Sequence, residues 1–210
     1  MKSEIIHILK MKKLIGIEHI SPVSFSRKKN DKLKLPDDIN IVKEYVDNCA
    51  LCELSKSKSS VLFAKGNGTS KIYIIGLNYN YNDDKKLSLI TKMVENVIHI
   101  DINNTYMTNI LKCTSTKMQN NFDDEVDSCI QYLEKQIIIG APKLIITLGN
   151  AFDYMIKTGE DIMDASGNLF SYNGIKLMPL MDPEFIYKNP SYKEKMFNDL
   201  QKIKKIMDDK

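Results

Sequence analysis

The stretch Tyr106-Met107-Thr108-Asn109-Ile110-Leu111-Lys112-Cys113 decides how the whole chain is interpreted. It is rich in aromatic and β-branched residues, which favour strands, and a polar segment follows it at residues 114–121. In α/β proteins, ligand-binding groups lie beyond the carboxyl ends of buried strands. The stretch therefore predicts that Asn109 lies at the end of a buried strand and that Cys113 lies just beyond it.

Cys113 is one of four cysteines, together with Cys49, Cys52 and Cys129. A C-x2-C pair and two distant single cysteines make a complete ligand set for one metal centre. We expect reduced thiols rather than disulfides, because the chain has no export signal. Structural zinc sites commonly use two close pairs, so the single close pair favours a [4Fe–4S] cluster. Zinc and buried free thiols are the alternatives.

The composition is typical of a globular protein without a membrane partner. The 210 residues suffice for one domain with a full-sized core. No apolar run is long enough to span a bilayer. Charges interrupt the apolar positions of residues 1–13, so we expect no signal peptide and a cytoplasmic location. We expect the chain to act as a monomer.

Positive charge is concentrated near the N-terminus. Residues 1–39 hold nine Lys or Arg and five Asp or Glu, whereas the whole chain has a formal net charge of +3. A helical spacing of apolar residues predicts a short amphipathic helix within 3–15, and the basic segment 21–38 is typical of a linker. We therefore expect a basic N-terminal extension, residues 1–39, and a folded domain, residues 40–210. The extension is either a solvated tether or an arm that contacts a nucleic-acid backbone.

Strands and helices alternate along the folded domain. Near-continuous apolar runs at 71–77 and 143–148 predict central parallel strands, and Asn173-Gly174 predicts the turn of a hairpin. The alternation predicts the α/β fold class, with a parallel sheet between layers of helices. The other expected elements are a strand at 60–64 and helices at 38–54, 87–99, 123–139, 150–157 and 191–207. Cys49 and Cys52 would then share one face of the first helix.

Residues 48–205 resemble the iron–sulfur uracil-DNA glycosylases of the family 4 type. The matching segments are NCALCEL, KIYIIG, YMTNILKC, DEVDSCIQYLEKQI, APKLIITLGNAF, GIKLMPLMDPEF and KNPSYK. The resemblance implies a three-layer α/β/α fold with a central parallel sheet, and a [4Fe–4S] cluster on Cys49, Cys52, Cys113 and Cys129. It also implies a hydrolase of base-excision repair that acts on uracil-containing DNA. Such an enzyme flips uracil out of the base stack and cleaves its N-glycosidic bond.

Two residues outside the cysteine set match family positions that contact DNA. Asn109 matches the uracil-binding Asn, whose amide can pair with the adjacent acceptor and donor of uracil. The alternative for Asn109 is a strand-end residue that caps a turn. Lys188 matches an Arg near the DNA backbone, which implies a phosphate contact.

The loop after the first central strand departs from the family pattern. Gly76-Leu77-Asn78-Tyr79-Asn80 replaces Gly-Glu-x-Pro-Gly, while Asp83 and Asp84 match the acidic pair that follows. The loop start is similar to that of mismatch-specific and single-strand-selective relatives, in which an Asn positions the water. We therefore expect Asn78, together with Asp84, to position water.

The family Phe that stacks on uracil is also absent. Tyr79 or Tyr81 is the candidate for a replacement stacking face. The alternative is that these tyrosines lie on the surface of the loop.

Asp182-Pro183-Glu184 stands where the family has His-Pro-Ser. The His stabilises negative charge on the departing uracil, and an ionised Asp182 has the wrong sign for this role. Asp182 contributes if burial protonates it, or if it faces positive charge that develops on the sugar. Lys112 or Lys188 is a substitute source of positive charge. The alternative for Asp182-Pro183 is a plain turn.

Three functional hypotheses follow from these residues. The first is a uracil-DNA glycosylase with a rearranged site, in which Asn109 binds uracil. The second is a catalytically weak or inactive iron–sulfur module that binds DNA, which Asp182 and Leu77 favour. The third is a four-cysteine metal scaffold that binds protein partners through its basic N-terminal segment. Asn109 favours the first hypothesis over the third.

Overall fold

The computed structural model describes residues 33–115 and 122–208. The chain divides into two units, residues 1–32 and 33–210, and the described residues belong to the second. The predicted helix within 3–15 lies outside the described residues, as does most of the predicted linker. No helix in the described part of the chain is long and apolar enough to cross a bilayer.

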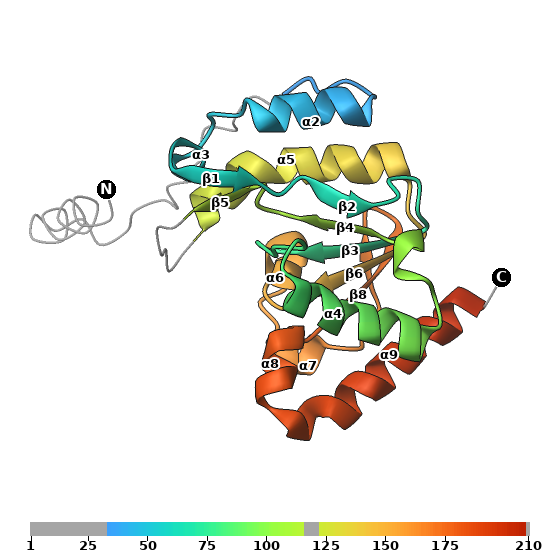
Figure 1. Cartoon of the computed structure of the whole chain (residues 1–210). Helices are drawn as coiled ribbons and strands as arrows, with labels where there is room; N and C mark the ends of the chain where they lie inside the picture. The colour runs from blue at the N-terminus through green and yellow to red at the C-terminus, as the bar shows by residue number, and fades with distance from the viewer. Residues whose placement is uncertain (1–32, 116–121, 209–210) are drawn as a thin grey trace, which may run out of the picture. The chain divides into compact units, whose positions relative to one another are not determined.

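A six-stranded sheet with the order β2-β4-β3-β6-β8-β7 forms the centre of the domain (Figure 1). The four inner strands run parallel, as predicted, and the two edge strands run antiparallel to their neighbours. In sheet order the strands are β2 (Ala64–Gly66), β4 (Tyr106–Asn109), β3 (Ile72–Gly76), β6 (Leu144–Leu148), β8 (Ile175–Leu180) and β7 (Phe170–Tyr172).

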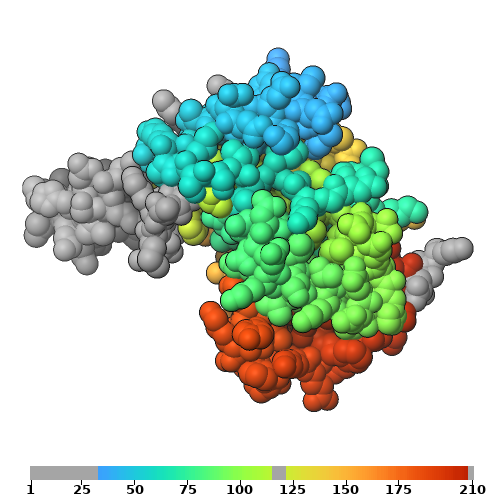
Figure 2. Space-filling model, viewed as in Figure 1, coloured from blue at the N-terminus to red at the C-terminus, as the bar shows by residue number. Residues whose placement is uncertain are grey.

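Helices cover both faces of the sheet, which confirms the three-layer α/β/α architecture. Because successive side chains of a strand point to opposite faces, Tyr73 and Ile75 pack in one core cluster while Ile72 and Ile74 pack in the other. The first cluster lies under α2 (Ile39–Asp47), α5 (Asp123–Gly140), α6 (Ala151–Ile156) and α7 (Ile162–Ala165). The second lies under α4 (Asp84–Met93), α8 (Pro183–Lys188) and α9 (Lys193–Asp208). Figure 2 shows α4 in green beside α8 and α9 in orange-red on one face of the molecule.

The short elements complete the described chain. A second, two-stranded sheet pairs β1 antiparallel with β5. The remaining bounds are α3 (Glu53–Lys56), β1 (Lys58–Val61), β5 (Cys113–Ser115), the π-helix η1 (Val94–Ile98) and the 3-10 helices η2 (Ile102–Asn104) and η3 (Pro190–Tyr192).

The predicted single helix over 38–54 is wrong, because the chain leaves the helix before the first cysteine. The Asn48 side chain donates to the Glu44 carbonyl at 2.9 Å, and Lys58 Nζ donates to the Asp47 carbonyl at 2.6 Å. These bonds satisfy the carbonyl groups of the last turn of α2, so the helix ends there. Cys52 has extended backbone and is the N-cap of α3.

Two other predicted elements begin or divide differently. The predicted strand at 60–64 is wrong as one unit, since β1 and β2 belong to different sheets. The helix predicted from residue 87 begins at Asp84, because Asp83 Oδ1 accepts hydrogen bonds from the backbone N–H groups of Lys85 and Lys86. The hairpin is confirmed: Asn173 and Gly174 have φ of 50° and 83°, as a type I′ turn requires.

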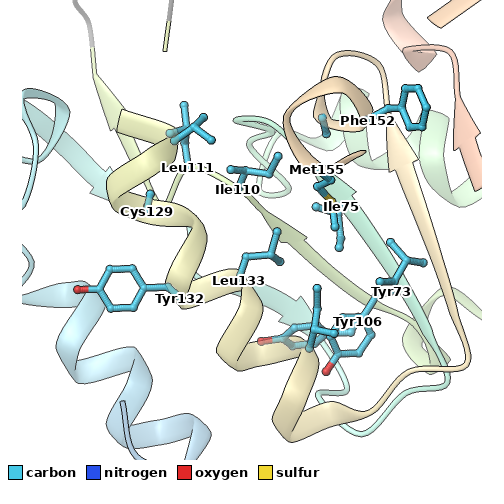
Figure 3. Packing of buried hydrophobic residues seen from close by; sticks show 14 of the residues in the cluster. Tyr73, Ile75, Tyr106, Ile110, Leu111, Cys129, Tyr132, Leu133, Phe152 and Met155 are labelled. Atoms are coloured by element: carbon cyan, nitrogen blue, oxygen red, sulfur yellow. The ribbon is translucent and has the colours of Figure 1, made fainter. Parts of the chain in front are cut away.

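The packing of α5 on the sheet gives a direct test of the core. Leu133 has no exposed surface, and Figure 3 shows it pointing from α5 toward the sheet. Leu133→Ala should lower the free energy of unfolding by roughly 2–5 kcal/mol, because it removes buried methyl groups and leaves a cavity. Ile138→Ala on the same helix is the control, since Ile138 is 68% exposed and should change stability by less than about 0.5 kcal/mol. Equal losses for the two variants in urea unfolding would contradict this packing.

Candidate functional site

Asn109 lies fully buried at the carboxyl edge of the sheet, as the last residue of β4. Its amide pairs twice with the backbone of Tyr79: Nδ2 donates to the carbonyl oxygen at 2.8 Å, and Oδ1 accepts from the N–H at 2.7 Å. Gly76 leaves room for this pair, because a Cβ there would lie 2.9 Å from Asn109 Oδ1 and 2.6 Å from Tyr79 Cδ2. Asn109 therefore presents one donor and one acceptor toward the loop that follows β3. In this arrangement Asn109 closes a turn, which agrees with the alternative prediction of a strand-end residue that caps a turn.

Tyr79 also connects this loop to Asp182. The Tyr79 hydroxyl donates a hydrogen bond to Asp182 Oδ2. Asp182 Oδ1 accepts from the backbone N–H groups of Glu184 at 2.7 Å and Phe185 at 3.3 Å, so Asp182 is the N-cap of α8. The plain-turn alternative is wrong, because an Asp N-cap with Pro183 at the first helical position starts a helix. Both Asp182 carboxylate oxygens are engaged.

Tyr79 is buried rather than exposed on the loop surface. Only 8% of Tyr79 and 4% of Tyr81 is exposed, so the surface alternative for these tyrosines is wrong. The two rings stack with centroids 6.0 Å apart, and Lys86 Nζ lies 5.7 Å from the Tyr79 centroid. Burial, and next the Asp182 carboxylate, raises the pKa of Tyr79 well above its ordinary value. The Tyr79 phenol therefore stays protonated and donates.

Asn78 and the acidic pair occupy different environments. Asn78 Oδ1 is buried and has no hydrogen-bond partner among the described residues. A buried acceptor without a partner is costly, so this atom is suited to accept from water or substrate. Asp83 Oδ1 caps α4, whereas Asp84 begins that helix and is exposed.

The two lysines considered as substitute positive charges are placed very differently. Lys188 ends α8 and is exposed. Lys112 is 1% exposed, and its Nζ donates to Thr108 Oγ1 at 2.8 Å, Asn109 O at 2.6 Å and Gln136 Oε1 at 2.5 Å. Burial lowers the pKa of Lys112 to about 7. Lys112 thus holds the main chain of Asn109 from within the core.

The structure brings the four cysteines together around one hollow. Cys49 follows α2, Cys52 begins α3, Cys113 starts β5, and Cys129 lies on the second turn of α5. The prediction that Cys49 and Cys52 share one helix is wrong, because the chain turns between them. Figure 3 shows Cys129 on α5 with Tyr132, which also lines the hollow and points toward α2.

The thiols of the hollow are electrostatically coupled. Burial raises the pKa of Cys113 and raises that of Cys129 to about 12, and negative charge on neighbouring cysteines raises both further. Positive charge that enters the hollow would therefore favour deprotonation of Cys113 and Cys129. The backbone N–H of Lys112 donates to Cys129 Sγ at 3.3 Å. Across residues 33–115 and 122–208, no three Cys, His, Asp or Glu side chains are arranged to hold a single metal ion.

Sequence reasoning missed two features of this region. One is the Tyr79–Asp182 hydrogen bond, which joins residues 103 positions apart and has no local signal. The other is the buried contact between Lys112 and Gln136. The signal for that contact was present, since Gln136 falls on the same stripe of α5 as the buried Cys129 and Tyr132.

Comparisons with known proteins place this geometry in context. Residues 63–201 match the family model described as Uracil DNA glycosylase superfamily. Three similar proteins are each named Type-4 uracil-DNA glycosylase. The one from Sulfurisphaera tokodaii is 25% identical over 187 residues, which cover 81% of this chain and 85% of the relative. For Saccharolobus solfataricus the values are 25% over 191 residues, with 83% and 88% covered. For Archaeoglobus fulgidus they are 26% over 184 residues, with 78% and 90% covered.

A double-mutant cycle should measure the contact between the loop and α8. Tyr79→Phe removes the hydroxyl and Asp182→Ala removes its acceptor, so their effects on the free energy of unfolding should be non-additive by roughly 1–3 kcal/mol. Tyr81→Phe is the control, because the Tyr81 hydroxyl donates to the Thr108 carbonyl and not to Asp182. Additive effects for Tyr79 and Asp182 would mean that their contact contributes nothing.

Proposed function

The chain belongs to the uracil DNA glycosylase superfamily, and on this premise we propose that it is a base-excision repair enzyme that hydrolyses the bond between uracil and deoxyribose in DNA. The observation that carries the proposal is the buried Asn109 amide at the end of β4. It presents the donor and acceptor that complement the edge of uracil, and it already binds a group with the same pattern, the N–H and C=O of Tyr79.

Uracil binding requires the Tyr79 backbone to leave Asn109. The incoming base offers N3–H to Oδ1 and O4 to Nδ2, so each lost hydrogen bond is replaced by one of the same kind. The loop at residues 78–80 therefore moves when the flipped base enters, as loops do in many enzymes that close around substrates. Once displaced, Tyr79 is the aromatic side chain available to stack on the base.

Hydrolysis needs a positioned water and stabilised charges. We assign Asn78 Oδ1 to accept a hydrogen bond from the attacking water, because this atom is buried without a partner among the described residues. The water oxygen bonds to the sugar C1′ as the C1′–N1 bond breaks and its electron pair stays on uracil. We assign the carboxylate of Asp84, and with it that of Asp83, to take up the proton of the water.

Asp182 and Lys188 act on the DNA side of the reaction. In the present arrangement Asp182 accepts from Tyr79, and when that bond opens its carboxylate can face the positive charge that develops on the sugar. Asp182 does not replace the family His as a donor. We assign Lys188 to a phosphate contact, because it is exposed at the far end of α8 and matches a family Arg near the DNA backbone.

A [4Fe–4S] cluster fits the four-cysteine hollow better than zinc. Each thiolate of such a cluster binds a different iron, so the sulfur atoms stand further apart than around one ion. Cys49, Cys52, Cys113 and Cys129 line one hollow, and four thiolates are the ligand number that such a cluster needs. A bound cluster would cross-link α2, α3, β5 and α5 through these cysteines, and it would take no part in the bond cleavage.

Asn109→Ala should lower excision of uracil by on the order of 100-fold or more, because the pair that recognises the base is lost. The assay uses anaerobically purified protein with a uracil-containing single strand and a U:G duplex. Asn103→Ala is the control, since Asn103 is an exposed residue just before β4. Unchanged excision by Asn109→Ala would rule out its role. DNA binding without excision by the wild-type protein would instead favour the inactive DNA-binding module.

Cys129→Ala should abolish the visible absorbance of the anaerobically purified protein and reduce its iron and sulfide content. Ser128→Ala is the matched control, because Ser128 lines the same hollow and bonds the Asp124 carbonyl through its own hydroxyl. Elemental analysis should find iron with sulfide in the wild type. Zinc without iron, or no metal, would contradict the cluster.

A further inference from the structure

The Lys112 side chain is only 1% exposed. Lys112 lines the cysteine hollow and also contacts Asn109. Its Nζ has three acceptors, which equal the three N–H bonds of an ammonium group. Gln136 Nε2 donates to the Tyr106 hydroxyl at 2.9 Å, which orients Gln136 Oε1 as an acceptor. Thr108 can accept because its own hydroxyl donates to the Phe63 carbonyl at 2.8 Å. The number of acceptors around Nζ therefore matches the charged form of Lys112.

The acceptors around Lys112 provide no counter-charge. All three are neutral groups: a hydroxyl, a main-chain carbonyl and a side-chain amide. The ionisable group in contact with Lys112 is the Cys129 thiol, whose Sγ accepts from the backbone N–H of Lys112 at 3.3 Å. Burial disfavours the charged form of a lysine unless an opposite charge lies close by. The negative charge that fits this position is the one that four thiolates and a bound cluster would carry.

Lys112 contacts both the cysteine hollow and Asn109. Its backbone N–H donates to Cys129 Sγ, and Lys112 itself lines the hollow next to Cys113. On the other side, its Nζ holds the carbonyl oxygen of Asn109, the residue whose amide recognises the base. Gln136 links the same group to Tyr106, at the start of β4. The contacts thus run without a gap from the cysteines to the strand that ends in Asn109.

We propose that Lys112 is a positioning residue that supplies the buried positive charge facing the four-cysteine centre and uses it to fix Asn109 at the end of β4. The proposal rests on the proposed cluster and on the proposed role of Asn109. It explains why a cluster that takes no part in the chemistry would lie close in sequence to the strand that carries the recognition residue, since Cys113 follows Asn109 by four residues. Loss of the cluster would remove the counter-charge and loosen the main chain of Asn109.

The first test measures the reduction potential of the cluster in Lys112→Met by voltammetry on the anaerobically purified holoprotein. A nearby positive charge favours the reduced, more negative cluster, so the variant should have a more negative potential than the wild type. Lys135→Met is the matched control, because Lys135 lies on α5 but pairs with the exposed Asp37. An unchanged potential in Lys112→Met would overturn the proposal. A redox-silent zinc centre would overturn it as well.

The second readout is excision. The kcat of Lys112→Met should fall on the order of 10-fold with little change in the KM for DNA, since one hydrogen bond to a charged group is lost from the main chain that carries Asn109. If the wild type does not excise uracil, the shift in potential still tests the charge of Lys112. Failure of the proposed function is therefore distinguishable from failure of this inference.

A third measurement needs no variant and covers the case in which Lys112→Met does not fold. Hydrogen exchange is compared in the wild type before and after removal of the cluster with an oxidant and a chelator. Exchange of the amides in residues 106–113 should speed up markedly, whereas β8 at residues 175–180 should change little. Equal changes in both segments would show general loosening and overturn the coupling.

Discussion

The pairing of the Asn109 amide with the Tyr79 backbone ties together the carboxyl edge of the sheet. Asn109 ends β4 and Tyr79 follows β3, so this pairing fixes the loop against the neighbouring strand. Through its hydroxyl, Tyr79 extends the connection to Asp182, which follows β8 and starts α8. Three strand ends are thereby linked through one residue. A fully paired buried polar network of this kind favours one arrangement over its alternatives.

The alternation of side chains along β4 places two polar systems on opposite faces of the sheet. Thr108 points to the face covered by α5, where it joins Lys112 and Gln136. Asn109, the next residue, meets the loop after β3, whose tyrosines pack in the cluster under α4 and α8. Lys112 Nζ bonds both the Thr108 hydroxyl and the Asn109 carbonyl oxygen, so this lysine connects the cysteine hollow to the base-recognition residue. The two systems are thus coupled by the pleat of one strand.

The sequence predicted the centre of this fold because the relevant signals are local. Continuous apolar runs identified β3 and β6, and Asn173-Gly174 identified the hairpin, since each pattern is contained in a few residues. The grouping of the four cysteines followed from their number and from the resemblance. The end of α2 was missed because a side chain, that of Asn48, terminates a pattern that otherwise continues. The start of α8 had the signals of Asp182 and Pro183, but it was interpreted as a variant catalytic motif.

The burial of Tyr79 could not be predicted in the same way, because its partners lie on β4 and α8, far away in the sequence. Those partners have a consequence for base selection. An Asn amide can pair with uracil in one orientation and with cytosine when it is flipped, since cytosine exchanges the donor and the acceptor. The N–H of Tyr79 holds Oδ1 and its C=O holds Nδ2, so the unflipped orientation is set before any base arrives. A flipped amide would set Nδ2 against the N–H of Tyr79 and Oδ1 against its carbonyl oxygen, which is costly in a buried site. The Tyr79 backbone must leave Asn109 before uracil binds. Until then it holds the Asn109 amide in the orientation that pairs with uracil.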